Sequence, residues 1–135
     1  IIFFEAVLLF FYTSNNAVVL MKPATQIMDD FYKASPDGLI GNEDCGQMSA
    51  WYVLSTLGFY PVNPANGTFV LGSPQVSSAT LFLPNNKTFT IKANNYSKTA
   101  IYNEVQRLNN QLIEQPFIRF EDITNGGSLI FEMID

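Results

Sequence analysis

The sequence contains no histidine and a single cysteine, Cys45, among its 135 residues. Without histidine, the chain alone cannot form a His-based catalytic triad, a His metal site or a His general acid or base. One cysteine cannot form an internal disulfide or a Cys-rich zinc site. Any chemistry that this chain carries must therefore rest on carboxylates, amides and hydroxyls.

Charged residues are also scarce, at 14% of the sequence, compared with about 25% in a typical soluble domain. The net charge of −5 argues against nucleic-acid binding, which needs a basic surface to meet the phosphates. A free-standing domain of this size normally carries a more charged surface. The composition therefore indicates that a partner surface covers part of this one, either because the chain is a piece of a larger protein or because it oligomerises.

Apolar residues are abundant: 47% of the sequence is hydrophobic, and there are twelve Phe and six Tyr. A chain of this length and composition can bury a core, which excludes a disordered protein and fits one ordinary domain. The most hydrophobic stretch, residues 1–21, is interrupted by Glu5 and by the polar run 13–16. Neither half reaches the roughly 20 apolar residues of a membrane span.

The same stretch does not fit a secretory signal peptide, because no basic segment precedes it and no small-residue cleavage site follows it. We expect a buried helix or a pair of strands in residues 1–21. The alternative is that the true N-terminus is missing or misread.

Two helices are predicted after this stretch. Residues 24–34 place apolar side chains at helical spacing, with Thr25 as a candidate N-cap, and the Ser-Pro-Asp-Gly run at 35–38 ends the helix. Residues 45–57 form the second helix, whose apolar positions cover more than one face, so we expect it to be buried on most sides. Gly58 is a candidate for its C-terminal cap.

The pattern changes to short runs rich in Thr, Val, Ile and Phe, separated by Asn- and Gly-rich turns. This spacing predicts an α+β fold in which two helices precede a small antiparallel β-sandwich, with residues 1–62 helical and residues 63–135 forming the strand region. The predicted strands are residues 68–71, 78–83, 88–93, 100–108, 117–120 and 128–133.

The candidate for chemistry is the run 37–47, in which two adjacent carboxylates lie between glycines directly before the second helix. In a structural interpretation, Asp44 is the N-cap and Gln47 completes a capping box, with Glu43 favourably placed at the positive end of the helix dipole. In a functional interpretation, one of the two carboxylates faces a substrate and acts as a base. The two interpretations are compatible if one carboxylate caps the helix and the other one faces substrate.

Three other residues in this region are weaker candidates. Cys45 could have a lowered pKa next to a helix N-terminus, but without a His partner we expect a small buried residue. Trp51 and Tyr52 could stack on a sugar ring, although within an apolar helix we expect them in the core.

The run DGLIGNEDCGQMSAWYVL at 37–54, followed by LGFYPV at 57–62 and LGSP at 71–74, resembles glycoside hydrolase family 92. The combination is specific, and the resemblance extends from about Lys22 to the end of the sequence. The first 21 residues depart from the family, which carries a His-containing stretch there.

The resemblance implies a calcium-dependent, inverting exo-α-mannosidase. Family members are several times longer than this chain and combine an N-terminal β-sandwich with an (α/α)6 barrel. This sequence looks like their C-terminal end, with the last two barrel helices followed by the terminal strands. The family implies degradation of N-glycans and a periplasmic or extracellular location.

By the same resemblance, Asp44 is the general base and Glu43 is its catalytic neighbour, while Asn42 and Gln47 contact the substrate. The general acid and the main calcium ligands are expected in segments absent from this chain. Inverting enzymes need two carboxyl groups about 6.5–9.5 Å apart, which two adjacent residues do not provide.

The expected partners are an α-mannoside glycan and the remainder of the parent enzyme, with no nucleic acid and no membrane span. We expect the isolated chain to be inactive. Two alternatives are a non-catalytic carbohydrate-binding or interaction module and an inactive truncated remnant.

Overall fold

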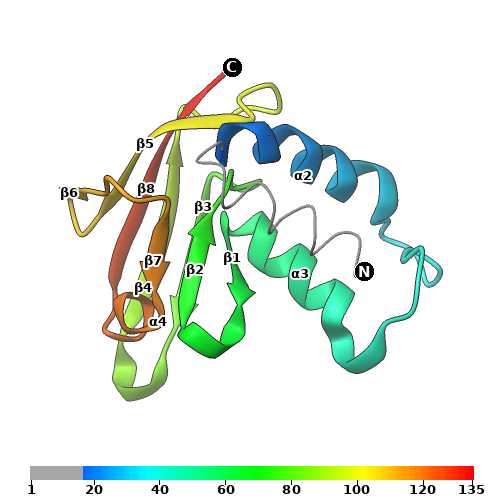
Figure 1. Ribbon diagram of the computed structural model, residues 1–135, viewed down its shortest axis with the longest axis horizontal. Coiled ribbons are helices and arrows are strands. Elements are labelled where there is room, and N and C mark those ends of the chain that lie inside the picture. Colours follow the sequence, from blue (N-terminus) through cyan, green and yellow to red (C-terminus); the bar gives the residue numbers. More distant parts are fainter. Residues whose placement is uncertain (1–16) are drawn as a thin grey trace.

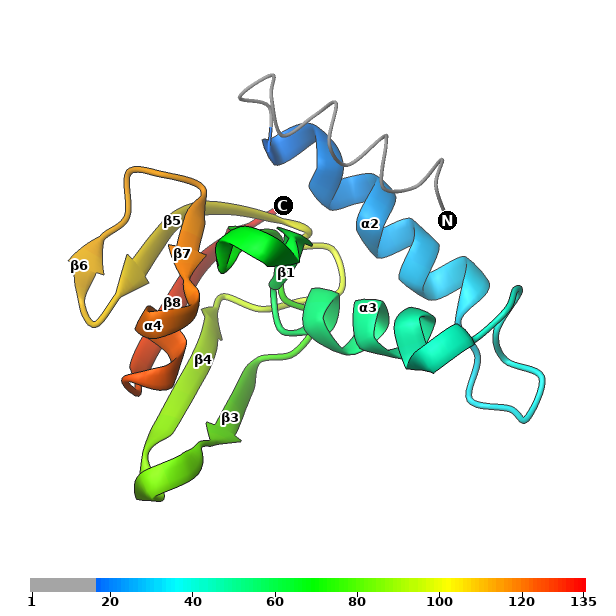
Figure 2. The ribbon, with the colours of Figure 1, turned by 60° about the horizontal axis from the view of Figure 1, so that its bottom comes forward.

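The computed structural model describes residues 17–135, so the expectation for residues 1–16 lies outside the described part of the chain. The described chain has an α+β fold, as predicted, with two long helices at one end and two β-sheets at the other (Figures 1 and 2). None of the described helices combines the length and apolar character that a membrane crossing requires. The helices are α2 (Ala17–Phe31), α3 (Gln47–Thr56) and α4 (Phe120–Thr124), with short 3-10 turns η1 (Asp44–Gly46), η2 (Pro64–Asn66) and η3 (Pro84–Asn86).

The strands form a three-stranded sheet in the order β1-β2-β7 and a five-stranded sheet in the order β3-β4-β8-β5-β6. Every pairing is antiparallel except that of β4 with β8, which is parallel and lies within the larger sheet. The prediction of an antiparallel sandwich is therefore wrong for this pair. The strands are β1 (Phe59–Asn63), β2 (Thr68–Leu71), β3 (Ser78–Phe82), β4 (Thr88–Asn94), β5 (Tyr102–Leu108), β6 (Gln111–Leu112), β7 (Phe117–Arg119) and β8 (Gly127–Ile134).

Helix α2 begins earlier than predicted and passes through Pro23. From residue 21 onward its buried side chains are Met21, Thr25 and Met28, which follow the helical period along one stripe. Because Thr25 lies inside the helix, its hydroxyl donates to the Met21 carbonyl oxygen at 3.0 Å. The prediction of Thr25 as an N-cap is therefore wrong, since the apolar run before Pro23 extends the helix.

Helix α3 lies close to its predicted position, and Gly58 follows it in the left-handed region at φ 89°. The prediction of burial on most sides is wrong, because no residue of α3 is buried by the described part of the chain. Tyr52 and Val53 are 38% and 55% exposed. Leu54 and Leu57 pack against the core between the sheets, yet the described residues cover this apolar helix only in part.

The hydrophobic core joins the inner faces of both sheets into one cluster. Alternate residues of the parallel pair β4 and β8 supply most of it, as the two-residue period of a strand requires. Phe89, Ile91, Leu129 and Phe131 are completely buried. The parallel pair β4 and β8 is therefore the most deeply buried part of the fold.

Polar side chains attach α2 to the sheets. Gln75 Nε2 donates to Thr25 Oγ1 at 3.0 Å, and Asn103 Nδ2 donates to the Gly72 carbonyl oxygen at 2.6 Å and to Met21 Sδ at 3.6 Å. The other polar atom of this amide, Asn103 Oδ1, is buried and has no hydrogen-bond partner in the part of the chain that the structure describes. This seam fixes the first of the two helices on the β region.

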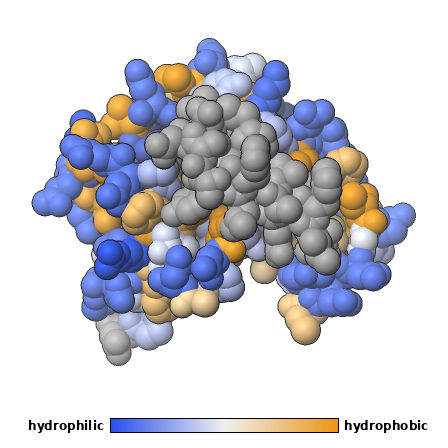
Figure 3. All heavy atoms as spheres, in the orientation of Figure 1, coloured by the Kyte–Doolittle hydropathy of each residue, from blue (hydrophilic) through white to orange (hydrophobic). Residues whose placement is uncertain are grey.

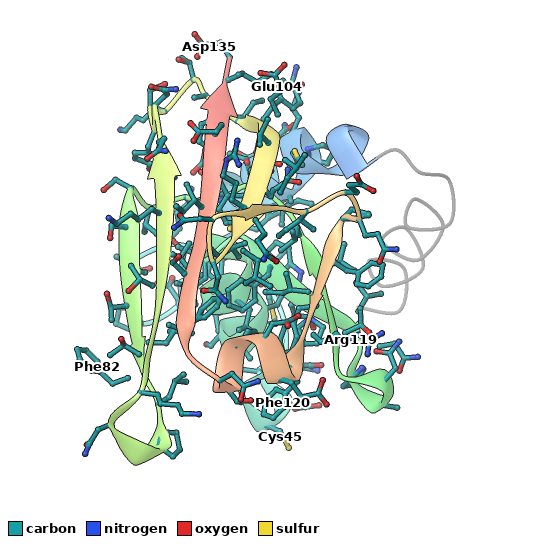
Figure 4. All side chains as sticks on the ribbon, turned by 90° about the vertical axis from the view of Figure 1, so that its left-hand side faces the viewer. Cys45, Phe82, Glu104, Arg119, Phe120 and Asp135 are labelled. Carbon is teal, nitrogen blue, oxygen red and sulfur yellow. The ribbon has the colours of Figure 1, made fainter. Side chains whose placement is uncertain are left out.

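Replacing Phe131 by Ala tests the position of the core. Phe131 has no exposed surface, so the Phe131→Ala variant should lose about 3–5 kcal/mol of unfolding free energy. The matched control is Phe82→Ala, because Phe82 is 87% exposed and points away from the sheet in Figure 4; this variant should stay within about 0.5 kcal/mol of the wild type. Urea denaturation measures both, and equal losses would contradict the assigned core.

Candidate active site

The acidic segment lies in the loop that joins α2 to α3, at the end of the helices remote from the sheets (Figures 1 and 2). An isolated bridge between Tyr32 and Leu39 and a hydrogen bond from the Lys33 amide to the Gly38 carbonyl oxygen close the first part of the loop. Apolar residues reach the surface at this helical end of the molecule (right in Figure 3), where Ile40 is 69% exposed. The loop is thus a folded hairpin that leads directly into the acidic pair.

The backbone turns sharply between the acidic pair and α3. Cys45 has φ 55° and Gly46 has φ 72°, so two successive residues are left-handed. This conformation is accessible to glycine, but it costs a non-glycine residue such as Cys45 about 1–3 kcal/mol. The turn separates Asp44 from the start of α3, whose N-cap is Gly46 without a side-chain cap bond. The predicted capping box of Asp44 and Gln47 is therefore wrong.

Glu43 supplies the hydrogen bond that the box was expected to make. The Ser49 backbone N–H donates to Glu43 Oε1 at 3.1 Å. Ser49 is the third residue of α3, and the first N–H groups of a helix have no intrahelical acceptor. The second oxygen, Glu43 Oε2, is buried and has no hydrogen-bond partner among the described residues. The spacing of six residues between Glu43 and Ser49 is not that of a capping box, so the sequence pattern could not indicate this contact.

The neighbouring carboxylate of Asp44 is exposed, and no hydrogen bond or ion pair engages it within residues 17–135. Asn42 is also exposed, directly before the pair, and Gln47 is half-buried at the start of α3. The four predicted site residues therefore lie in one short segment. They do so in different environments, with Glu43 bound to the helix and the Asp44 side chain without a partner among the described residues.

Aromatic rings cover the start of α3. Tyr32 stacks on Tyr52 and Trp51, with ring centroids 4.8 and 5.6 Å apart, and its hydroxyl donates to the Met48 carbonyl oxygen at 3.2 Å. Burial is the main cause that raises the pKa of Tyr32, followed by the negative charge of Glu43 and then by Tyr60. The helical spacing of residues 24–34 indicates only that Tyr32 lies on a helix face. It does not indicate that the Tyr32 ring stacks on α3 beside the acidic pair.

Cys45 lies on the outer side of the turn. Figure 4 shows its sulfur projecting from the lower edge of the molecule, and the thiol is free and exposed. The prediction of a buried Cys45 is therefore wrong, because the left-handed turn directs this residue away from α3 and its aromatic cover.

The loop does not by itself offer a calcium site. Calcium in proteins takes about 6–8 oxygen ligands. No group of three or more Asp, Glu, His or Cys residues that could hold a metal occurs in the described part of the chain. One carboxylate oxygen of the acidic pair is already bound to the Ser49 amide. The described residues therefore do not fit a calcium ion without ligands from elsewhere.

The chain belongs to glycosyl hydrolase family 92, because the model of the family's catalytic domain matches residues 4–135. The match includes residues 4–21, which are most of the stretch that was expected to depart from the family. A secreted glycosidase of the fungus Arthroderma benhamiae, itself uncharacterized, is 26% identical over 129 residues, which are 93% of this chain and 16% of the relative.

Solved structures of the family include a segment with the same fold. A family GH92 α-mannosidase of Bacteroides thetaiotaomicron, in complex with mannoimidazole, is 34% identical with a TM-score of 0.86, over 92% of this chain and 16% of that one. A family GH92 inverting mannosidase of the same organism is 34% identical with a TM-score of 0.76, over 84% of this chain and 15% of that one. The chain thus spans about one-sixth of the length of these relatives.

The alkaline stability of the chain tests the contact between Tyr32 and its surroundings. Since the folded-state pKa of Tyr32 is above the usual 10.0, its contribution to stability is complete below that pH and is lost as the pH rises through the folded-state pKa. The unfolding free energy of Tyr32→Phe should therefore fall less steeply above pH 10 than that of the wild type. Urea denaturation at several pH values above 10 gives the pH dependence of the unfolding free energy for both proteins. Identical pH dependence would contradict a raised pKa of Tyr32 in the folded state.

Proposed function

We propose that this chain is the C-terminal part of a calcium-dependent, inverting exo-α-mannosidase and supplies the loop that carries its general base. The observation that carries the proposal is the exposed carboxylate of Asp44, which has no partner within residues 17–135, on the left-handed turn before α3. Support comes from the relatives, since two of them are described as an α-mannosidase and an inverting mannosidase.

In this mechanism Asp44 removes a proton from a water molecule as the water oxygen bonds to the anomeric carbon from the face opposite the leaving group. The bond from that carbon to the glycosidic oxygen breaks, and a general acid protonates the leaving oxygen. Glu43 is not this acid, because it adjoins Asp44 and already binds the Ser49 amide. We place the acid in a segment of the parent enzyme outside this chain. Asn42 and Gln47 would contact the sugar hydroxyls beside the base.

The remainder of the parent enzyme is the proposed partner of this chain. Helix α3 is apolar on several sides and yet has no buried residue among those described, as expected of a helix that other helices of an (α/α)6 barrel cover. The calcium ion would take its main ligands from that remainder and would serve to bind and orient the sugar. The substrate would be an α-mannoside of N-glycans, met in the periplasm or outside the cell, since the fungal relative is secreted.

The isolated chain should release no mannose from an α-mannoside, with or without calcium, because the proposed general acid and the main calcium ligands belong to the remainder of the parent enzyme. A chimera in which residues 22–135 replace the matching segment of the Bacteroides α-mannosidase should hydrolyse the same substrate. Mannose release by both proteins measures the difference. Turnover by the isolated chain, or a correctly folded but inactive chimera, would contradict the proposed function.

Within the chimera, Asp44→Asn should lower kcat by about 10²–10⁴-fold, because the amide cannot accept the proton from water. The melting temperature should change little, since the Asp44 side chain makes no hydrogen bond within the described residues. Kinetics on an α-mannoside and a thermal melt give the two readings. A variant that keeps its kcat but melts early would identify Asp44 as a structural residue only.

A further inference from the structure

We propose that Glu43 is a positioning residue, which holds the left-handed turn and thereby presents Asp44 to the reacting water. This inference rests on the proposed function, because it concerns the same loop and the same reaction. It assigns a different task to each of the two adjacent carboxylates. Glu43 fixes the loop to α3, and Asp44 remains available for proton transfer.

Glu43 accepts two hydrogen bonds that hold the turn, one on its backbone carbonyl oxygen and one on its side chain. The Gly46 amide donates to the Glu43 backbone carbonyl oxygen at 3.1 Å, and the Ser49 amide donates to Glu43 Oε1 at 3.1 Å. The two bonds therefore connect Glu43 to the end of the turn and to the first turn of α3. A hydrogen bond to a charged carboxylate is stronger than one between neutral groups, so this side chain can offset the unfavourable φ of Cys45.

The surroundings of the two carboxylates favour this division over the reverse one. Glu43 is half-buried beside the Tyr32 ring, whose pKa responds to its charge, and Glu43 Oε2 is shielded from solvent. A water molecule that attacks a sugar must reach the base directly. Asp44 is exposed and can meet such a water, whereas Glu43 Oε2 is buried and Glu43 Oε1 already accepts the Ser49 amide.

The first arm of the test uses the 135-residue chain and measures order in the loop by NMR. In the wild type, the Ser49 amide should exchange slowly with solvent, because Glu43 is its acceptor. Glu43→Ala should remove this protection and lower the order parameters of the Asp44 and Cys45 amides. Glu43→Gln should retain both, since its amide oxygen can still accept the bond.

The matched control is Asp122→Ala. Asp122 Oδ2 accepts a hydrogen bond from the Arg119 amide at 2.7 Å at the start of α4, so this variant also removes a carboxylate-to-amide bond. It should leave the exchange of Ser49 and the order of Asp44 unchanged. This control shows whether a general loss of stability, without any change in the acidic loop, could produce the effects expected of Glu43→Ala.

The second arm measures kinetics in the chimera. Glu43→Ala should lower kcat by about 10²-fold, as expected of a misplaced catalytic group, with a smaller change in KM. Glu43→Gln should recover most of this loss and keep the acidic limb of the kcat/KM profile, which Asp44→Asn should abolish. Asp122→Ala should keep the kcat of the unmodified chimera.

Two results would overturn the proposal. If Glu43→Gln is as inactive as Asp44→Asn and loses the acidic limb, Glu43 is itself the base. If Glu43→Ala leaves the Ser49 exchange and the loop order unchanged, Glu43 does not hold the turn. An unmodified chimera that folds but does not turn over would instead contradict the proposed function, while the NMR arm still decides whether Glu43 orders Asp44.

Discussion

The hydrogen bond between the Ser49 amide and the Glu43 carboxylate spans a backbone turn that would otherwise be unfavourable. Cys45 and Gly46 are both left-handed, and only one of them is a glycine. The bond satisfies a helix N-terminal amide and at the same time fixes the direction in which the chain enters α3. As a consequence, one carboxylate of the pair is held against the protein and the other faces outward. The candidate chemistry of the loop depends on this asymmetry.

Two further layers connect the loop to the β-sheets. The ring of Tyr32 covers the first turns of α3, and Thr56 Oγ1 contacts Met28 Sδ at 3.7 Å, so the helices pack together. The bond from Gln75 to Thr25 then attaches α2 to the β region. The helices thus rest on the sheets, while much of the apolar surface of α3 remains uncovered by the described residues.

Local patterns in the sequence predicted the elements well and their environments poorly. Strand β2 has the predicted bounds, because alternation and turn residues are local signals. The parallel pairing of β4 with β8 joins segments far apart in the chain, which a local pattern cannot specify. Likewise, the motif located the acidic pair, but a capping-box spacing favoured Asp44 as the cap. The N-cap is Gly46, and the side chain that accepts a helix amide is that of Glu43, because a left-handed turn intervenes and brings Glu43 to Ser49.

The most direct test of this division of tasks is a crystal structure of the chimera with a mannose-like inhibitor bound. The account predicts a water molecule on the far face of the anomeric carbon, with an Asp44 carboxylate oxygen about 2.6–3.2 Å from it. It also predicts that Glu43 Oε1 still accepts the Ser49 amide. A structure in which Glu43 has left Ser49 and binds this water, while Asp44 faces solvent, would contradict the account.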